Sequence, residues 1–406
     1  SPSLRADRLE DAARALREAG EDHEPFACLA DAVRDAVLDA RGAGGFPDGT
    51  EVVEPDPQRF RSLRDRMDAL APDWALLAWH RRERGLPPPR RLEGEEDPYL
   101  AVSQDLLRFT TRLEAAGEET VTLFSPSGPT LRLWCLDPSA WLAGCFASLA
   151  GAVCQSATLD PEVHGALLGL DCDRTDLVRL PAPFDPDRLG VVVAPAVSTR
   201  YRHRGRDRAA TADLLDRVVA AIPGNAAVLF PSFEHRDQVA GLLGLAGRLP
   251  LVQERSMDDA ARDRLLQALR ERPAGAPPRV LLGVLGGVFA EGVDLPGDAL
   301  LGVVVVGPAL PAVTPEQEWV RGWHHARTGD GFRTAYLVPG MTRVVQAAGR
   351  VVRSETDLGV VVLVDQRFLQ HAYARYFPPE WAPVRSARPW EEVARFFDGH
   401  GIVSPR

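Results

Sequence analysis

The strand-like segments in the second half of the chain are apolar on both faces. Residues 302–306 read Gly-Val-Val-Val-Val, and residues 359–364 are equally apolar. A strand with one face in water alternates polar and apolar residues, so unbroken apolar runs are typical of a parallel sheet covered on both sides. From about Leu180 such runs alternate with helical patterns. The sequence therefore predicts a doubly wound α/β domain, with ligand loops at the carboxyl ends of its strands.

The expected elements of this domain follow from hydrophobic periodicity and turn residues. Strands are expected at 189–194, 226–231, 279–285, 301–306, 334–338 and 359–365. Helices are expected at 209–221, 234–245, 259–271 and 342–352.

The first part of the chain has a different hydrophobic pattern. Apolar residues recur at every third or fourth position from Ser3 to about Gly117, as in helices. Residues 120–124 and 130–136 are strand-like and flank a Ser-Pro-Ser-Gly-Pro turn, which favours a hairpin, and 154–158 is expected to be a third strand. We expect three parts, at residues 1–118, 119–180 and 181–406.

Composition limits the class of protein. A chain of 406 residues is long enough for two or three domains, and none of its apolar stretches reaches the ~20 residues of a membrane span. The first residues lack the plan of a secretory signal and begin without methionine. Five cysteines without a Cys-x-x-Cys pair argue against a disulfide framework or a zinc site. We expect a cytoplasmic protein that has no membrane partner and starts inside a longer sequence.

Not one lysine occurs in the chain, so all 47 basic residues are arginine. A phosphate loop of the Gly-x-x-x-x-Gly-Lys-Ser/Thr kind is therefore excluded, and the chain cannot cradle ATP unaided. The lack of lysine fits a GC-rich bacterial genome. A formal charge of −10 is not typical of a simple nucleic-acid binder, so a DNA contact would need a local basic track. Residues 201–208 (Tyr-Arg-His-Arg-Gly-Arg-Asp-Arg) offer one; the alternative is a solvated loop before a helix that starts near Ala209.

Residues 346–353 (Gln-Ala-Ala-Gly-Arg-Val-Val-Arg) combine a glutamine, a glycine and two arginines. At the start of a helix, Arg350 and Arg353 would point to one side. Two guanidiniums so placed can share the charge that develops on a transferring γ-phosphate. Gly349 would let the backbone come close. The alternative is a surface arginine pair on a solvated helix.

Two other segments, 155–159 (Gln-Ser-Ala-Thr-Leu) and 286–297 (Gly-Gly-Val-Phe-Ala-Glu-Gly-Val-Asp-Leu-Pro-Gly), precede this one. Together, in chain order, the three closely resemble motifs III, V and VI of superfamily 2 DNA helicases of the XPD/DinG type. The flanks at 341–346 and 364–368 resemble that family too, and the likeness extends over roughly 120–377.

This resemblance implies an architecture. Residues 181–406 would be the second RecA-like helicase domain, a doubly wound parallel sheet, and 119–180 would hold the last strands of the first RecA-like domain. The mainly helical segment 1–118 matches the position of the family's arch; an unrelated helical subdomain is the alternative.

The resemblance also implies an activity. Relatives are ATP-dependent helicases that move 5′ to 3′ on single strands, with single-stranded and forked DNA, ATP and Mg²⁺ as partners. Their phosphate loop and Asp-Glu-Ala-His box precede motif III, and many hold an iron–sulfur cluster, ligated by four cysteines, between the two. We therefore expect a fragment that is inactive alone and needs its missing upstream half to bind ATP and Mg²⁺ and to hold any cluster. The alternative is a non-catalytic helicase-like module for DNA or protein binding.

The resemblance implies a role for each matching residue. The catalytic residues would be Gln346, Arg350 and Arg353, with Arg353 as the arginine finger. The nucleotide-binding residues would be Gly287, Glu291, Gly292, Asp294 and Gly349. Ser156 and Thr158 would couple the phosphate site to the DNA surface, and Ser232, with the amides of Glu234 and His235, would hold a DNA phosphate.

Several of these residues have plainer interpretations. Glu291 and Asp294 could cap a turn, Ser232 could be an ordinary helix cap, and Ser156 and Thr158 could simply end a strand. In the basic track we expect Arg204 to contact DNA. The cluster Trp319, Trp323, His324 and His325 could stack on bases or belong to a packed helix.

Overall fold

The computed structural model describes residues 1–40, 49–92, 96–271, 275–287 and 297–402. The chain forms two compact units, one from Ser1–Leu142 with Val313–Arg327, the other from Ala143–Ala312 with Thr328–Arg406. Within the described ranges, no helix combines the length and the apolarity that a bilayer crossing requires.

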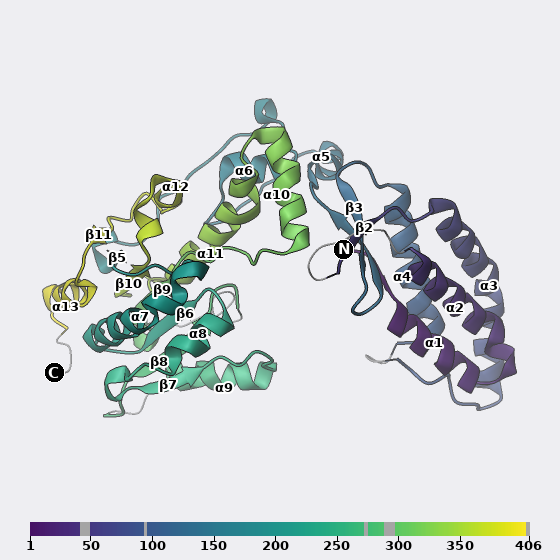
Figure 1. The fold of residues 1–406 in the computed structure, drawn as a ribbon, viewed down its shortest axis with the longest axis horizontal. Helices are drawn as coiled ribbons and strands as arrows, with labels where there is room; N and C mark the ends of the chain where they lie inside the picture. The colour runs from purple at the N-terminus through teal and green to yellow at the C-terminus, as the bar shows by residue number, and fades with distance from the viewer. Residues whose placement is uncertain (41–48, 93–95, 272–274, 288–296, 403–406) are drawn as a thin grey trace. The chain divides into compact units, whose positions relative to one another are not determined.

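The second unit is built on a seven-stranded sheet with the order β11-β5-β10-β9-β6-β8-β7, in which every pairing is parallel. Its strands are β5 (Leu189–Ala194), β6 (Ala226–Phe230), β7 (Leu249–Val252), β8 (Arg279–Val284), β9 (Gly302–Val306), β10 (Gly359–Val364) and β11 (Val384–Arg385). The predicted doubly wound parallel sheet is confirmed, since helices cover both faces of the sheet (Figure 1).

The apolar strands pack their two faces into two different cores. Val303 and Val305 of β9 belong to one core, and Val304 and Val306 to the other. One face is covered by α9 (Asp259–Arg270), α11 (Val338–Ala348) and α12 (His371–Ala374), and the other by α7 (Tyr201–Ala221), α8 (Phe233–Ala240) and α13 (Pro389–Gly399). Each fully buried valine or leucine contributes roughly 1.5–3 kcal/mol by leaving water, which explains the unbroken apolar runs.

The first unit combines a small sheet with helices. Its antiparallel sheet has the order β1-β4-β3-β2, from β1 (Ser3–Arg5), β2 (Glu51–Val53), β3 (Thr120–Ser125) and β4 (Thr130–Cys135). The predicted hairpin is therefore present as β3 and β4. The helices α1 (Ala6–Glu18), α2 (Glu24–Asp39), α3 (Pro57–Glu83) and α4 (Pro98–Glu114) share one apolar core with this sheet. Nearly all of α10 (Pro315–Thr328) belongs to this unit, far along the chain from its neighbours.

The remaining elements are short. They are α5 (Ser139–Ala147), α6 (Pro161–Leu167), the π-helix η6 (Arg333–Leu337) and the 3₁₀ turns η1 (Glu21–His23), η2 (Cys172–Arg174), η3 (Pro186–Arg188), η4 (Leu245–Gly247), η5 (Gly297–Ala299) and η7 (Gln366–Leu369).

The structure corrects three of the expected elements in the second unit. The strand expected at 334–338 is the π-helix η6, which runs directly into α11, because a short apolar run alone does not distinguish a strand from a buried helix. The helix expected at 342–352 begins at Val338 and ends at Ala348, before Gly349. Helix α7 starts at Tyr201 rather than near Ala209, because its first two turns lack the apolar stripe that marks a helix in sequence.

A fourth correction concerns 154–158, which is not a strand. Residues 151–156 have no regular structure, and 157–158 form a turn. The neighbouring Val153 is 90% exposed, so this segment has no apolar surface to pack on among the described residues.

The compact units also have limits other than 118/119 and 180/181, because β3 and β4 pair with β1 and β2. The assignment of 1–118 to an arch and of 119–180 to the first RecA-like domain stays a prediction.

Candidate functional site

Gln346, Arg350 and Arg353 lie around the end of α11. Gln346 is half-buried in the last turn of the helix, Gly349 and Arg350 form a turn beyond it, and Arg353 lies in the irregular segment that leads to β10. The expected placement of both arginines at the start of one helix is wrong, because α11 ends at Ala348, before both of them. Val351, between the two arginines, packs against Gly359 at the start of β10, so Arg350 and Arg353 lie toward the amino ends of the strands, whereas the ligand loops were expected at the carboxyl ends.

Asp357 organises the loop that follows Arg353. The backbone N–H groups of Arg353 and Ser354 both donate to Asp357 Oδ2 at 2.9 Å, and the Ser354 hydroxyl donates to Oδ1 at 2.7 Å. Burial raises the pKa of Asp357, but these hydrogen bonds outweigh it and hold the pKa below its usual value. Arg188, just before β5, donates from Nε to the Asp357 carbonyl at 2.8 Å. The backbone at Arg353 is therefore fixed to the amino edge of the sheet.

Gly286 and Gly287 follow β8 at the opposite edge of the sheet. A Cβ on Gly286 would lie 3.1 Å from Arg343 Nε, and a Cβ on Gly287 would lie 2.7 Å from Gln253 Nε2. Gln253 is buried, and its Oε1 accepts a hydrogen bond from Val284 N–H at 3.0 Å. A side chain at position 287 would be too close to the packed amide of Gln253. The packing alone therefore requires glycine at this position, independently of any role of Gly287 in nucleotide binding.

The other residues of this motif, Glu291, Gly292 and Asp294, lie outside the described residues. The chain enters this segment from the carboxyl end of β8 and leaves it near Asp357, whose carboxylate accepts a hydrogen bond from the Gly297 backbone.

Ser232 is the amino-terminal cap of α8. Its Oγ accepts a hydrogen bond from His235 N–H at 3.2 Å. The plain cap interpretation of Ser232 therefore holds, and a further contact with a phosphate stays a prediction. His235 is buried, and burial together with the charge of Arg204 lowers its pKa to about 4.

A buried network joins the carboxyl ends of β5 and β10. Asp365, which is fully buried, accepts hydrogen bonds on Oδ2 from the N–H and the hydroxyl of Thr199, both at 2.7 Å. Arg367 donates from Nε to Asp365 Oδ1 at 3.0 Å. Arg204 in turn donates from Nε to the Thr199 carbonyl at 2.9 Å. The structure thus places Arg204, in the first turn of α7, at the carboxyl edge.

Ser156 and Thr158 form a local turn. Thr158 N–H donates to Ser156 Oγ at 3.2 Å, and the two hydroxyl oxygens lie 3.4 Å apart. Two residues later, Asp160 anchors this part of the second unit to η6, since Arg333 Nη2 lies 3.0 Å from Asp160 Oδ2.

The aromatic cluster of α10 packs within the first unit. Trp323 Nε1 donates to Asp137 Oδ2 at 3.3 Å, and His324, which is buried, has Nε2 at 3.1 Å from the Leu136 carbonyl. These two residues are therefore part of a packed helix, and stacking on bases stays a prediction.

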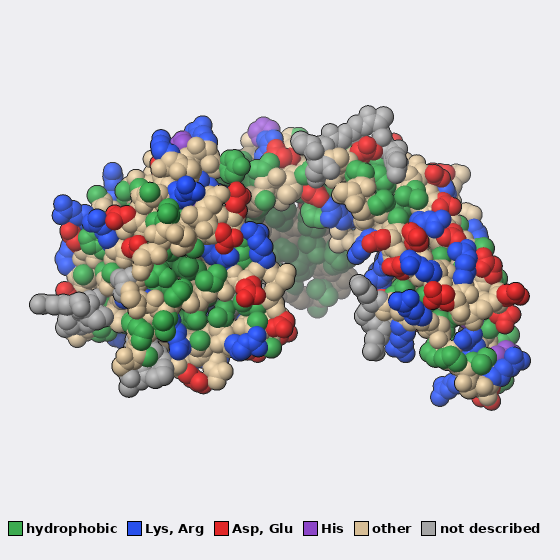
Figure 2. All heavy atoms as spheres, turned by 60° about the horizontal axis from the view of Figure 1, so that its bottom comes forward, with side chains coloured by type: hydrophobic (Ala, Val, Ile, Leu, Met, Phe, Trp, Pro, Cys, Tyr) green, Lys and Arg blue, Asp and Glu red, His purple; other side chains and the backbone are tan. Residues whose placement is uncertain are grey.

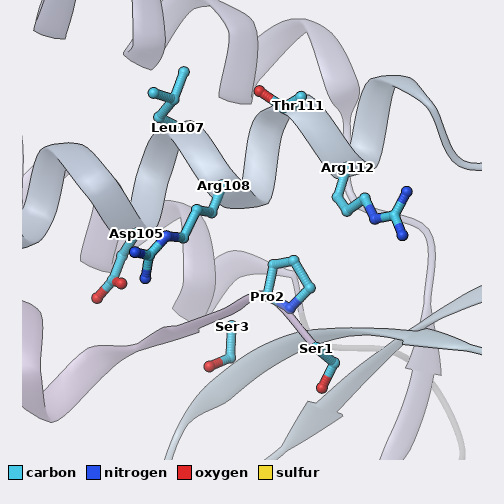
Figure 3. Close-up of a pocket in the computed structure, with 8 residues that line it drawn as sticks. All are labelled: Ser1, Pro2, Ser3, Asp105, Leu107, Arg108, Thr111 and Arg112. Carbon is cyan, nitrogen blue, oxygen red and sulfur yellow. The ribbon is translucent and has the colours of Figure 1, made fainter.

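A cavity of about 580 Å³ lies in the first unit, between α4 and the first three residues of the chain (Figure 3). Its charged lining consists of Asp105, Arg108 and Arg112, and it includes none of the predicted site residues. The described part of the chain contains no cluster of three or more His, Cys, Asp or Glu side chains that could hold a metal ion.

Comparison with known proteins gives the family. Residues 215–384 match the model of the helicase C-terminal domain. The chain is 32% identical over 232 residues to the Probable ATP-dependent helicase MJ0942 of Methanocaldococcus jannaschii, with 53% of this chain and 34% of the relative covered. It is 25% identical over 319 residues to the ATP-dependent DNA helicase DinG of Photobacterium profundum, with 76% and 41% covered. Residues 215–384 thus match a helicase C-terminal domain, and both relatives are named as ATP-dependent helicases. The chain spans about a third to two fifths of the length of these two relatives.

Solved structures of XPD confirm the RecA-like fold. The structure titled XPD_Helicase superposes with a TM-score of 0.56 at 16% identity, covering 95% of this chain and 65% of that one. The S. tokodaii Xpd4 structure superposes with a TM-score of 0.57 at 15% identity, covering 95% and 72%.

The family model and the geometry single out different residues of this chain. The matched range includes Ser232, Gly287, Gln346, Arg350 and Arg353, and it begins after Ser156, Thr158 and Arg204. The structure adds residues that were not predicted as members of the site: Thr199, Gln253, Asp357, Asp365 and Arg367. Polar residues directly after an apolar strand, such as Asp365, were the available signal for part of this set.

Proposed function

We propose that this chain is the carboxyl-terminal portion of an ATP-dependent DNA helicase of the cytoplasm, which translocates 5′ to 3′ on single strands and unwinds forked DNA. The observation that supports this most strongly is the helicase C-terminal domain match at 215–384, because it includes the glutamine, glycine and two arginines of residues 346–353. The two relatives compared above are named as ATP-dependent helicases.

In this proposal the two edges of the sheet have different tasks. At the amino edge, Arg350 and Arg353 stabilise the charge that develops on the transferring phosphoryl group, and Gln346 orients the γ-phosphate or the attacking water. Gly287, Glu291, Gly292, Asp294 and Gly349 complete the nucleotide side. At the carboxyl edge, Ser232 and Arg204 bind the DNA backbone, and Ser156 and Thr158 couple the two sites.

The groups that this chain lacks come from the upstream half in this proposal. Without a lysine there is no phosphate-loop cation, and the described residues contain no carboxylate cluster suited to Mg²⁺. The upstream half would supply the phosphate loop, the magnesium ligands and any iron–sulfur cluster. When bound, Mg²⁺ would neutralise phosphate charge.

The test is unwinding by the chain joined to its upstream sequence, with 5′-tailed and 3′-tailed duplexes compared. Unwinding with ATP and Mg²⁺ from the 5′ tail is expected, with a rate that falls as salt rises. Unwinding of 3′-tailed substrates alone contradicts the polarity.

The second candidate is a helicase-like module that binds DNA or protein without catalysis. The complete absence of lysine favours it for the chain taken alone. The two candidates differ in the coding sequence upstream of Ser1, which either does or does not encode a phosphate loop and an Asp-Glu-Ala-His box.

A further inference from the structure

Four arginines alternate along the first two turns of α7, and the structure distinguishes between two of them. Arg206 is exposed and forms an ion pair with the adjacent Asp207 at 2.6 Å. Arg204 is half-buried, and its Nε is already bound to the Thr199 carbonyl at 2.9 Å. The position of the Arg204 guanidinium is therefore set by the backbone at Thr199.

The Thr199 backbone is itself held in place. Asp365 accepts both the N–H and the hydroxyl of Thr199, and Arg367 Nη2 donates to the same hydroxyl oxygen at 2.8 Å. Gly307, at the end of β9, has a positive φ of 81° and leaves room for this hydroxyl, since a Cβ there would lie 2.1 Å from Thr199 Oγ1. The ends of three neighbouring strands thus fix the carbonyl that positions Arg204.

The two terminal nitrogens form the outer end of the Arg204 guanidinium. Among the residues that the structure describes, no hydrogen-bond partner is present for its two terminal nitrogens. Burial and the charge of Arg367 lower the pKa of Arg204, and Glu234 and Tyr201 offset this in part. A partly desolvated cation that repels a second cation gains from binding an anion.

An aromatic ring lies next to this cation. Tyr201 is 81% exposed, and its ring centre is 5.8 Å from the Arg204 guanidinium carbon. A cation beside an exposed ring suits a single nucleic-acid strand, because the cation binds a phosphate while the ring stacks on a base. On the face shown in Figure 2, arginine and acidic side chains are interspersed, and this face carries no broad, purely basic surface.

We propose that Arg204 binds a backbone phosphate of single-stranded DNA, that Tyr201 stacks on an adjacent base, and that Thr199, Asp365 and Arg367 position Arg204 for this contact. The two terminal nitrogens of a guanidinium match two oxygens of one phosphate. This inference rests on the proposed DNA-binding function and adds to it the residues that set the geometry.

The contact is tested on the 406-residue chain with a fluorescein-labelled oligothymidylate, by anisotropy titration at several salt concentrations. Arg204→Ala should weaken binding about tenfold and reduce the salt slope by about one. Arg206→Ala, the matched control, should change affinity less than about twofold, because that guanidinium is engaged by Asp207. Tyr201→Ala should weaken binding and leave the salt slope unchanged.

The positioning role is tested by a double-mutant cycle. Thr199→Val removes the hydroxyl with little change of shape, and it should weaken binding in the wild-type background but not in Arg204→Ala. Asp365→Asn should behave in the same way; thermal unfolding of each variant checks that the fold is retained. If Thr199→Val weakens binding equally in both backgrounds, the positioning role is wrong.

Other results separate this inference from the proposed function. If the wild type binds oligothymidylate and Arg204→Ala binds it equally well, the inference is overturned and the proposed function is not. In the chain joined to its upstream half, a loss of ATP binding with unchanged oligothymidylate binding in Arg204→Ala would place Arg204 in the nucleotide site, which also overturns it. No oligothymidylate binding by the wild-type chain overturns DNA binding by this chain and the inference with it.

Discussion

Asp160 and Arg333 form a largely buried ion pair across 173 residues of the chain. Arg333 Nη2 donates to both carboxylate oxygens of Asp160, at 3.3 and 3.0 Å, while Nε donates to the Tyr376 hydroxyl at 3.0 Å. The side chains of Asp160 and Arg333 are only 9% and 17% exposed. The pair ties the segment after Thr158 to η6, the π-helix that continues into α11 and Gln346. It is a direct physical connection between the regions that resemble motifs III and VI.

Arg333→Gln should destabilise the second unit, because it leaves the Asp160 carboxylate largely buried without its cation. We expect a loss of roughly 3 kcal/mol in the free energy of unfolding, the low end for a buried pair since both groups keep some exposure. Urea unfolding measures it. The control is Arg375→Gln, which removes a looser contact with Glu162 at 3.8 Å. If the two variants lose the same free energy of unfolding, the ion pair with Asp160 makes no specific contribution to stability.

The stability of the chain should fall between pH 7 and pH 5 because of His235. Burial and the charge of Arg204 lower its pKa from 6.5 to about 4, so the unfolded chain takes up a proton in this range and the folded chain does not. The stabilising effect of neutral His235 is thus present above pH 6.5 and is lost as the pH falls towards 4. The loss by pH 5 should be about 2 kcal/mol.

Thermal unfolding at both pH values checks this prediction. In His235→Gln the difference in stability between pH 7 and pH 5 should be smaller than in the wild type. The control is His400→Gln, at an exposed position, which should leave this difference unchanged. An undiminished pH dependence in His235→Gln would assign the effect to other groups.

Arg353→Ala in the enzyme joined to its upstream half should reduce kcat for ATP hydrolysis by roughly 10³-fold, as for an arginine finger. Arg353→Lys should not restore it, because a point charge does not replace a planar fork. DNA affinity should change little. Ser232→Ala should do the opposite, with weaker DNA binding and a nearly intact basal ATPase rate. Wild-type hydrolysis together with lost DNA binding in Arg353→Ala would move this arginine to the DNA side.

The 406-residue chain alone should release no phosphate from ATP, because it lacks the lysine of a phosphate loop. Steady-state phosphate release, compared with Arg353→Ala as the background control, measures this. Adding the upstream half should start turnover. Sustained hydrolysis by the chain alone, above that background, would mean that its own arginines complete a nucleotide site.

Much of the second unit could be predicted from local sequence. Strands that are apolar on both faces, such as β9 and β10, are stable only when both faces are buried. Their sequence therefore predicts a sheet that is covered by helices on both sides. The elements that were predicted wrongly are those in which hydrophobic periodicity gives no signal. η6 is a short apolar run in a helix, and the first turns of α7 hold arginines in place of an apolar stripe.

The sequence by itself determined the parallel α/β class, the order of most strands and helices, and the motifs that match the helicase family. Tertiary structure alone decided that Arg350 and Arg353 follow a helix, that Gly287 faces Gln253, and that Arg204 differs from Arg206. Periodicity is a property of neighbouring residues, so it can report which face of an element is buried. The contacts of Asp365 with Thr199 and of Asp160 with Arg333 join residues more than 160 positions apart, and they exist only once the strands have paired and the helices have packed.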